Sequence, residues 1–352
     1  MKRQADALVR TGFKPDIVIL GAEGAIGHHI VKAFAGKGMQ VAAVSQAPAT
    51  RNAGANVHFL QCDVCDSDAL ARLICDAPFL VNAARPKITE DWADCERKVQ
   101  EAIDAVSSAC KRAGVKRLVH ISSLAALYLG DKGDVITGRA PVDPYGWQRS
   151  NYSRARGVEE IALLTQFEET ALPVSILRPG ILVGEGATPY HAGVGLFSEA
   201  HRCIGRDDGR HPLPFVLGED VASAVVAATE RNGVLGHCYN LAGDVRLSAR
   251  EYIEALGKAL GRPLVFQPRS PTMLYYSELA KWGIKRVGGH DAAHPSKRDL
   301  HSRAMVATLD CSDVKAALDW APVADRETFI ARGILVHTDN RHASDAGSGR
   351  GG

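Results

Sequence analysis

The glycines near the N-terminus have a spacing that suits phosphate binding. The run Gly21-Ala22-Glu23-Gly24-Ala25-Ile26-Gly27 follows an apolar segment and precedes a helical one. Gly21 permits a sharp turn out of a strand, Gly24 removes the Cβ that would block a diphosphate, and Gly27 lets the helix pack closely on a sheet. The helix N-terminus then presents free amides and the positive end of its dipole. This turn therefore predicts a nucleotide-binding site.

The segments that position this turn alternate between strands and helices. The β-branched runs have continuous hydrophobicity, as expected for strands that are covered on both faces. The expected strands are Ile17–Leu20, Val41–Val44, Val57–Leu60, Phe79–Asn82, Leu118–Ile121 and Val174–Leu177. Helical stretches separate most of them, among them Ala25–Gly36, Asp91–Ala113 and Asn151–Thr170. This alternation predicts an α/β fold of Rossmann type with a doubly wound parallel sheet.

Beyond Pro179 the pattern becomes looser and predicts a smaller C-terminal capping region. Glycines and prolines between residues 184 and 214 indicate loops around short elements. Ser248 and Glu251 form a capping-box pattern at the start of a helix that extends to Leu260. The basic, His-rich segment Gly283–Ser302 is expected to be an irregular solvated loop rather than a metal site, because its histidines lack compact ligand spacing.

The chain divides accordingly into three parts. Residues 15–180 are expected to form a nucleotide-binding Rossmann core. Residues 181–338 are expected to supply the remaining core elements and the capping region that covers a substrate. The small polar residues of 339–352 predict a disordered tail.

Further motifs follow the glycine turn in order along the chain. They are Cys62-Asp63-Val64, Val81-Asn82-Ala83-Ala84, Leu177-Arg178-Pro179-Gly180 and Gly236-His237-Cys238-Tyr239-Asn240-Leu241-Ala242-Gly243. Together with the G-x-x-G-x-x-G spacing of the turn, they resemble the extended branch of the short-chain dehydrogenase/reductase superfamily, the NAD-dependent epimerase/dehydratase family. The resemblance covers roughly residues 16–336.

The resemblance implies which residues would bind a nicotinamide dinucleotide. They are Gly21, Gly24, Ala25, Ile26 and Gly27 around the diphosphate, Asp63 and Val64 at the adenine, Ala83 and Ala84 along the cofactor, and Pro179 at the nicotinamide.

The end of the second expected strand bears on the choice between NAD and NADP. An acidic residue at this place binds the ribose 2′-hydroxyl and repels a 2′-phosphate. Here the strand ends without a carboxylate, and Ser45 and Arg51 offer groups that suit a 2′-phosphate. The sequence therefore favours NADP over NAD, with a solvated Arg51 as the alternative.

The resemblance also implies a pair of catalytic hydroxyl groups. A tyrosine, whose ordinary pKa is about 10, needs a nearby cation to act as a base at neutral pH. The family places Tyr-x-x-x-Lys on one helix face and a Ser or Thr at the end of the fifth strand. Here Ser123 ends that strand, and Tyr152 with Glu160 matches the longer family pattern, but Arg156 stands in place of the lysine.

Arginine at position 156 alters the expected chemistry. It keeps a positive charge near the tyrosine and can donate to the cofactor ribose, but it does not release a proton at any ordinary pH. A protein that binds the cofactor without catalysis is therefore one alternative. Tyr145 with Arg149 has the same spacing, and we prefer Tyr152 because Glu160 completes its pattern.

Three functions remain open on these grounds. We favour an NAD(P)-dependent oxidoreductase or epimerase that acts on a hydroxyl or keto group of a sugar nucleotide or similar small molecule. A hydroxysteroid- or flavanol-like reductase and a non-catalytic dinucleotide-binding protein are the alternatives. Dehydration is disfavoured, because Leu124 and Ala125 follow Ser123 where dehydratases usually carry an Asp-Glu pair. Candidates for the substrate pocket are Arg85, Tyr190, His191, Arg202, Arg206 and Arg210.

Composition bears on partners and location. The chain has 352 residues and a formal net charge of +2, which gives no electrostatic case for a nucleic-acid partner. Because no apolar run suits a signal peptide or a transmembrane helix, we expect a cytoplasmic protein without a membrane partner. Alanine-rich faces on the helices at 91–113 and 151–170 fit either a homodimer, which the resemblance suggests, or intramolecular packing.

The eight cysteines are scattered along the chain. Most lie among alanines and aliphatic residues, so we expect small core hydrophobes in a reducing compartment. Cys62 and Cys65 have C-x-x-C spacing, which leaves a redox-active pair as the less favoured alternative.

Overall fold

The computed structural model describes residues 13–47, 54–74, 77–198, 201–289 and 294–337. The expected tail at 339–352 and the side chain of Arg51 lie outside these ranges.

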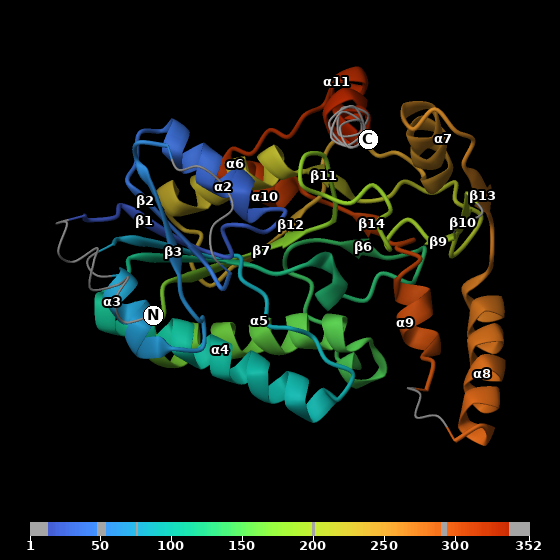
Figure 1. The fold of residues 1–352 in the computed structure, drawn as a ribbon, viewed down its shortest axis with the longest axis horizontal. Coiled ribbons are helices and arrows are strands. Elements are labelled where there is room, and N and C mark those ends of the chain that lie inside the picture. Colours follow the sequence, from blue (N-terminus) through green and yellow to red (C-terminus); the bar gives the residue numbers. More distant parts are fainter. Residues whose placement is uncertain (1–12, 48–53, 75–76, 199–200, 290–293, 338–352) are drawn as a thin grey trace, which may run out of the picture.

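A seven-stranded parallel sheet forms the centre of the molecule, in the order β12-β7-β5-β4-β1-β2-β3 (Figure 1). The strands are β1 (Ile17–Leu20), β2 (Val41–Ser45), β3 (Val57–Gln61), β4 (Phe79–Asn82), β5 (Arg117–Ile121), β7 (Val174–Pro179) and β12 (Cys238–Leu241). All the expected strands are present, and the Rossmann-type fold is confirmed. The strand order reverses between β1 and β4, the place where parallel α/β sheets bind their ligands.

Helices cover both faces of the sheet. One layer contains α3 (Ser67–Ile74), α4 (Trp92–Ala113) and α5 (Asn151–Thr170), and the other contains α2 (Gly27–Gly36), α6 (Gly218–Glu230) and α10 (Ser312–Leu318). Alternate residues of β1 divide between the two cores. Ile17 and Ile19 pack in the core beneath α2 and α6, whereas Val18 and Leu20 pack in the core beneath α3 and α4. Two-sided burial therefore explains the continuous hydrophobicity of the strands.

The helices α4 and α5 also pack against each other through Cys95, Val99 and Ala155. Intramolecular packing thus accounts for part of their small-residue faces, and the homodimer stays a prediction.

The smaller region follows β7. Its elements are β8 (Ile181–Val183), β9 (Leu196–Ser198), β10 (Arg202–Ile204), β11 (Phe215–Leu217), α7 (Ala249–Ala259), β13 (Val265–Gln267), α8 (Pro271–Val287), α9 (Lys297–Ser302), β14 (Thr308–Leu309) with its partner β6 (Val135–Ile136), α11 (Arg326–Ile330) and a π-helical turn at Ala331–Leu335. A separate core supports it, in which the rings of Phe215 and Tyr252 stack at 4.9 Å. The expected capping box of Ser248 and Glu251 is present at the start of α7.

Both ends of the segment Gly283–Ser302 are helical, so the prediction of an irregular loop was wrong for these residues. α8 extends through Gly283 to Val287, and α9 begins at Lys297 and ends at Ser302. Ser270 caps α8 by accepting from the Met273 amide, and Pro271 occupies the first turn, where a missing N–H costs nothing. Capping by serines at each start thus outweighs the polar, His-rich composition.

The described helices include none that is long and apolar enough to cross a membrane. Of the cysteines that the structure describes, Cys62, Cys95, Cys110, Cys203 and Cys311 are buried and all are free thiols. Burial raises the pKa of Cys62 to about 11, so little of this thiol is ionised at neutral pH. That weakens the case for a redox-active pair with Cys65.

Candidate active site

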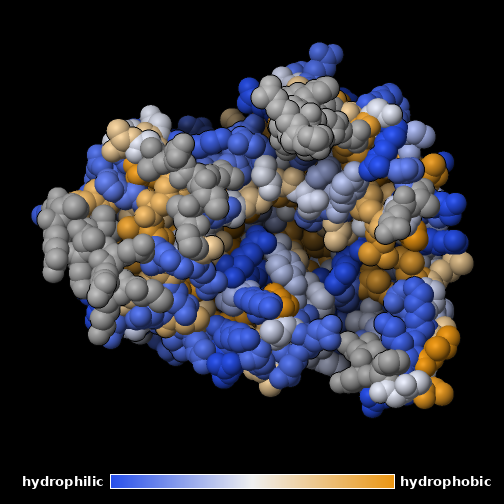
Figure 2. Space-filling model, viewed as in Figure 1, coloured by the Kyte–Doolittle hydropathy of each residue, from blue (hydrophilic) through white to orange (hydrophobic). Residues whose placement is uncertain are grey.

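A cavity of about 1640 Å³ extends from the glycine turn after β1 to the helices α8 and α9. Figure 2 shows it as a hollow in the face of the molecule, with hydrophilic residues along its rim. The carboxyl ends of β1, β4 and β5 open into it, since Gly21, Ala83 and Ser123 all line the cavity. The sheet therefore brings the predicted binding turn and a predicted catalytic hydroxyl group to one space.

The glycine turn is built so that only glycine fits at two of its positions. Gly21 has a φ of +78°, and a Cβ there would lie 2.6 Å from the backbone of Ala83. A Cβ on Gly27 would lie 2.1 Å from the Gly21 carbonyl oxygen. Gly24 lines the cavity beside the N-terminus of α2, whose first amides have no partner within the helix. These residues fit the diphosphate of a dinucleotide.

Most of the other predicted cofactor residues line the same cavity. They are Ala25, Ile26, Ser45, Val64, Ala83, Ala84 and Pro179. Asp63 is instead exposed, and its carboxylate accepts from the Cys65 amide at 3.0 Å. The hydroxyl of Ser45 donates to the Ala47 carbonyl. The structure thus gathers the predicted set around one space, with Asp63 outside its lining.

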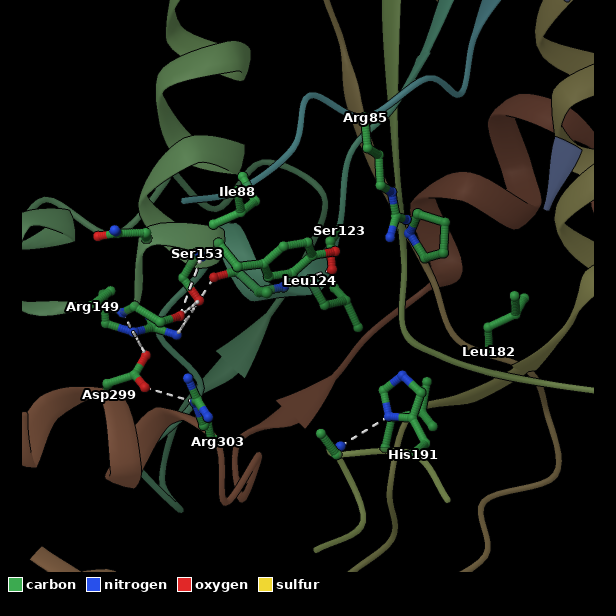
Figure 3. Close-up of a pocket in the computed structure, with 18 of the residues that line it drawn as sticks. Arg85, Ile88, Ser123, Leu124, Arg149, Ser153, Leu182, His191, Asp299 and Arg303 are labelled. Atoms are coloured by element: carbon green, nitrogen blue, oxygen red, sulfur yellow. Dashed lines mark hydrogen bonds and ion pairs between the residues drawn. The ribbon is translucent and has the colours of Figure 1, made fainter. Parts of the chain in front are cut away.

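The two serines after β5 have different surroundings. Ser122 is fully buried, and its hydroxyl donates to the Glu160 carboxylate. Ser123 lines the cavity and caps the short helix Leu124–Ala126, with its Oγ accepting from the Ala125 amide at 3.2 Å. Figure 3 shows Ser123 at the centre of the cavity wall. Ser123 is therefore the hydroxyl that can reach a bound substrate.

Tyr152 lies in the first turn of α5, half-buried, and lines the cavity. Spacings of four residues place Tyr152, Arg156 and Glu160 on one face of this helix. Glu160 accepts from Arg178 of β7 through Nε at 2.9 Å and Nη2 at 2.6 Å, with both side chains buried. This pair anchors α5 to the sheet and so fixes where Tyr152 lies.

Arg156 is fully buried behind Tyr152 and lies outside the lining of the cavity. Its Nη2 is 2.5 Å from Glu159 Oε1, and its Cζ is 5.6 Å from the Tyr152 ring centroid. The contact with Glu159 continues to His120, whose Nε2 lies 3.4 Å from Glu159 Oε2. The guanidinium group thus keeps its charge near the tyrosine but is directed into the protein. The i,i+3 spacing of Arg156 and Glu159 is the sequence signal that corresponds to this ion pair.

The alternative pair, Tyr145 and Arg149, has a different arrangement. Tyr145 is 52% exposed and lies outside the cavity lining. Arg149 is buried and pairs with Asp143 at 2.9 Å and with Asp299 at 3.2 Å. Arg149 therefore ties the loop before α5 to α9, and the geometry favours Tyr152 as the tyrosine beside the substrate.

Several of the predicted substrate residues reach the cavity. Arg85, His191 and Arg206 line it, whereas Tyr190, Arg202 and Arg210 do not. Burial, followed by the charges of Arg206 and Arg85, lowers the pKa of His191. Residues of α8 and α9 and their neighbours, such as Trp282, Lys285, Asp299 and Arg303, also line the cavity. Sequence reasoning missed them because no local pattern shows that distant helices fold over the sheet edge.

A potential metal-ligand group, Asp207, Asp208 and His211, lies in the loop after β10. Asp207 Oδ2 is 2.8 Å from His211 Nδ1, and the other Asp207 oxygen accepts from the Gly209 amide. Asp208 accepts from the Arg210 amide at 3.0 Å. Because these carboxylates stabilise their own turn, we assign no metal to the group.

Comparisons with known proteins agree with this geometry. The family model for the NAD-dependent epimerase/dehydratase family matches residues 17–242. The chain is 27% identical over 256 residues to a (4-alkanoyl-5-oxo-2,5-dihydrofuran-3-yl)methyl phosphate reductase of Streptomyces griseus, which covers 71% of this chain and 76% of the relative. It is 26% identical to a UDP-glucose 4-epimerase of Mycolicibacterium smegmatis, over 70% of this chain and 83% of that one.

A solved structure shows the same fold. The dTDP-glucose 4,6-dehydratase DesIV of Streptomyces venezuelae, with NAD bound, superposes with a TM-score of 0.67 at 19% sequence identity, covering 93% of this chain and 98% of that chain. The family match extends over more than half of the chain and includes the glycine turn, Ser123 and Tyr152. The chain therefore belongs to the NAD-dependent epimerase/dehydratase family.

Proposed function

We propose that this protein is an NAD(P)-dependent oxidoreductase or epimerase that acts at a hydroxyl or keto carbon of a small molecule. The observation that carries the proposal is that Ser123 and Tyr152 line the same cavity as the glycine turn. The relatives named above include a reductase and an epimerase, which fits hydride chemistry at such a carbon.

Each side chain has a role that its position supports. When bound, the nicotinamide supplies or accepts the hydride. Ser123 donates a hydrogen bond to the substrate oxygen, and Tyr152 gives a proton to that oxygen or removes one from it. Gly24 and the N-terminus of α2 hold the diphosphate, and Ala83 and Pro179 border the path of the cofactor.

Arg156 acts indirectly in this scheme. Its buried charge is paired with Glu159 and lies 5.6 Å from the Tyr152 ring centroid, but it has no access to the cavity for a proton relay. A second cation, Arg85, lies on the cavity side with its Cζ 5.8 Å from the Tyr152 ring centroid. Tyr152 thus lies between two guanidinium groups, and we assign the positive charge on the cavity side to Arg85.

For the cofactor we propose NADP, with NAD as the alternative. The residues at the end of β2 that line the cavity, Ser45, Gln46 and Ala47, carry no negative charge that would repel a 2′-phosphate. The Ser45 hydroxyl already donates to Ala47. Selectivity through Ser45 therefore requires this hydroxyl to rotate towards the ligand.

Turnover assays test the proposal. The protein is incubated with NADPH and a set of keto phosphate esters while the nicotinamide absorbance is followed. In a second assay it is incubated with NAD and UDP-glucose, and the epimerised sugar nucleotide is measured by chromatography, because epimerisation returns the cofactor to its starting oxidation state. Turnover that falls by about 100-fold or more in Tyr152→Phe and Ser123→Ala, at unchanged cofactor binding, is the expected result. Cofactor binding without turnover in either assay would favour the non-catalytic alternative.

A further inference from the structure

The substrate end of the cavity holds a buried cation that forms no ion pair with a carboxylate of the described residues. Arg206, in the loop after β10, is 5% exposed and lines the cavity. One Nη of its guanidinium donates to the Ala192 carbonyl, and its Nε has no hydrogen-bond partner among the described residues. Burying a charge is costly unless an opposite charge or hydrogen bonds compensate it. An anionic ligand beside Arg206 would therefore be strongly stabilised.

The carboxylate that acts on Arg206 is already engaged by other groups. Asp299 pairs with Arg303 at 2.6 Å and with Arg149 at 3.2 Å, and it accepts from the Ser150 amide at 3.0 Å. Burial and the neighbouring charge of Arg303 lower the pKa of Arg206 to about 10, which leaves it charged at neutral pH. Figure 3 shows Asp299 between Arg149 and Arg303. The charge of Arg206 is thus only partly balanced within the described chain.

His191 offers a second donor at this end of the cavity. Its Nδ1 accepts from the Gly193 amide at 2.9 Å, so that nitrogen carries no proton. The proton of the neutral ring must then lie on Nε2, which is a hydrogen-bond donor. The charges of Arg206 and Arg85 both lower the pKa of His191, so both guanidinium groups lie within electrostatic reach of this ring.

Arg85 extends this positive region to the reacting groups. It is exposed, lines the cavity and makes no ion pair with another described residue. The Cζ atom of Arg85 is 5.8 Å from the Tyr152 ring centroid. At this distance the guanidinium group can reach a substrate oxygen that lies beside Tyr152. In Figure 3, Arg85, Ser123, His191 and Arg303 surround the same open space.

We propose that Arg206, Arg85 and His191 form a phosphoryl-binding subsite next to Tyr152, so that the substrate carries a phosphate monoester. Two guanidinium groups and a neutral imidazole donor match the charge and the several oxygens of such a group. The role as a substrate subsite rests on the proposed function, whereas phosphate binding by these residues does not. A nucleotide diphosphate presents similar oxygens, and the experiment below separates the two.

Calorimetric titrations test the subsite on protein loaded with NADPH, which occupies the glycine turn. The ligands are inorganic phosphate, glucose 1-phosphate and UDP-glucose, and the proteins are wild type, Arg206→Met and the control Arg202→Met. Arg202 lies on β10, is exposed and is outside the cavity lining. We expect phosphate and glucose 1-phosphate to bind to wild type and to the control. Their affinity for Arg206→Met should be lower by at least about tenfold.

Three results would overturn the subsite. They are no phosphate binding to wild type, equal binding to Arg206→Met, and tight UDP-glucose binding without binding of the monoester, which would assign the cations to a diphosphate. If Arg206→Met does not fold, the pKa of His191 in wild type is followed by NMR, with a rise on phosphate addition expected and no change overturning the proposal. If NADPH fails to bind, the proposed function is contradicted but the phosphate subsite is not. The subsite is then tested by the same phosphate titrations on the protein without cofactor.

Discussion

Arg156 and Glu159 form an ion pair inside the protein, with Nη2 and Oε1 separated by 2.5 Å and neither side chain more than 2% exposed. The pair lies where the family pattern has lysine, one turn after Tyr152. An arginine that reached the cavity would compete for space with the cofactor, because its planar fork is bulkier than an ammonium group. Glu159 instead directs the guanidinium group into the helix–sheet interface, so the substitution changes the core rather than the cavity wall.

Breaking this pair on one side should destabilise the protein. Glu159→Gln leaves the buried charge of Arg156 without its partner, at a cost of about 3–5 kcal/mol in the free energy of unfolding. The double variant Arg156→Met/Glu159→Gln removes both charges and should recover much of that loss. Urea unfolding measures both. The matched control is Glu254→Gln, whose pair with Lys258 is exposed and should contribute less than about 1 kcal/mol. Equal effects in the buried and exposed pairs would contradict the structural role of Glu159.

Replacing Tyr152 with Phe should separate catalysis from binding. The ring still fills its place between Arg85 and Arg156, but the hydroxyl that exchanges the proton is lost. We expect kcat to fall by about 100-fold or more, with the Kd for the cofactor unchanged within about twofold. Tyr145→Phe is the control, since Tyr145 lies outside the cavity lining. If Tyr145→Phe loses activity and Tyr152→Phe does not, the catalytic tyrosine is Tyr145, with Arg149 as its cation.

An acidic residue at the end of β2 should change the cofactor preference. In Ser45→Asp the new carboxylate would accept from a ribose 2′-hydroxyl and repel a 2′-phosphate. The ratio of the NADPH and NADH dissociation constants, from fluorescence titration, should shift towards NADH by about tenfold or more. An unchanged ratio would show that the ribose does not lie beside Ser45.

Asp220 should make the protein less stable as the pH rises. Burial raises the pKa of this carboxyl to about 6, above its value in the unfolded chain, so its stabilising contribution is complete below about pH 4 and is lost as the pH rises through about 6. Asp220→Asn, which can still accept from the Val323 amide, should be more stable than wild type at pH 8 by up to about 3 kcal/mol.

The difference between Asp220→Asn and wild type should vanish near pH 4. Unfolding by urea at both pH values measures it, and the exposed Asp319→Asn serves as the control with an effect within about 0.5 kcal/mol. A constant difference at both pH values would mean that Asp220 does not titrate in this range.

Local patterns were sufficient to predict the sheet and the glycine turn. The strands could be predicted from the continuous hydrophobicity that burial on both faces requires. The start of α7 could be predicted from the capping box of Ser248 and Glu251. Ser123 lines the cavity whereas Ser122 does not, and the reason is a contact between residues 38 positions apart, Ser122 and Glu160. Sequence spacing alone does not show which of two adjacent hydroxyls is engaged.

The substrate end of the cavity was less predictable. Arg206, His191 and Arg85 come from separate loops, and only the fold brings them together. The C-terminal end of α8 was missed because it belongs to the basic, His-rich segment Gly283–Ser302, which resembles a solvated loop, while the cap at Ser270 and the proline that follows it start the helix. Pairings over such sequence distances depend on tertiary packing, which neither periodicity nor motif spacing records.

The most direct test of the account is a fluorescence titration of NADPH and NADH into wild type, Gly24→Val and the control Gly36→Ala. A side chain at Gly24 would extend from the turn that lines the cavity, whereas a Cβ at Gly36 meets nothing within 4 Å. We predict saturable binding to wild type and to Gly36→Ala, with affinity lower by about tenfold or more in a folded Gly24→Val. Failure of both dinucleotides to bind wild type, or equal binding to Gly24→Val, would contradict the claim that this turn holds the cofactor.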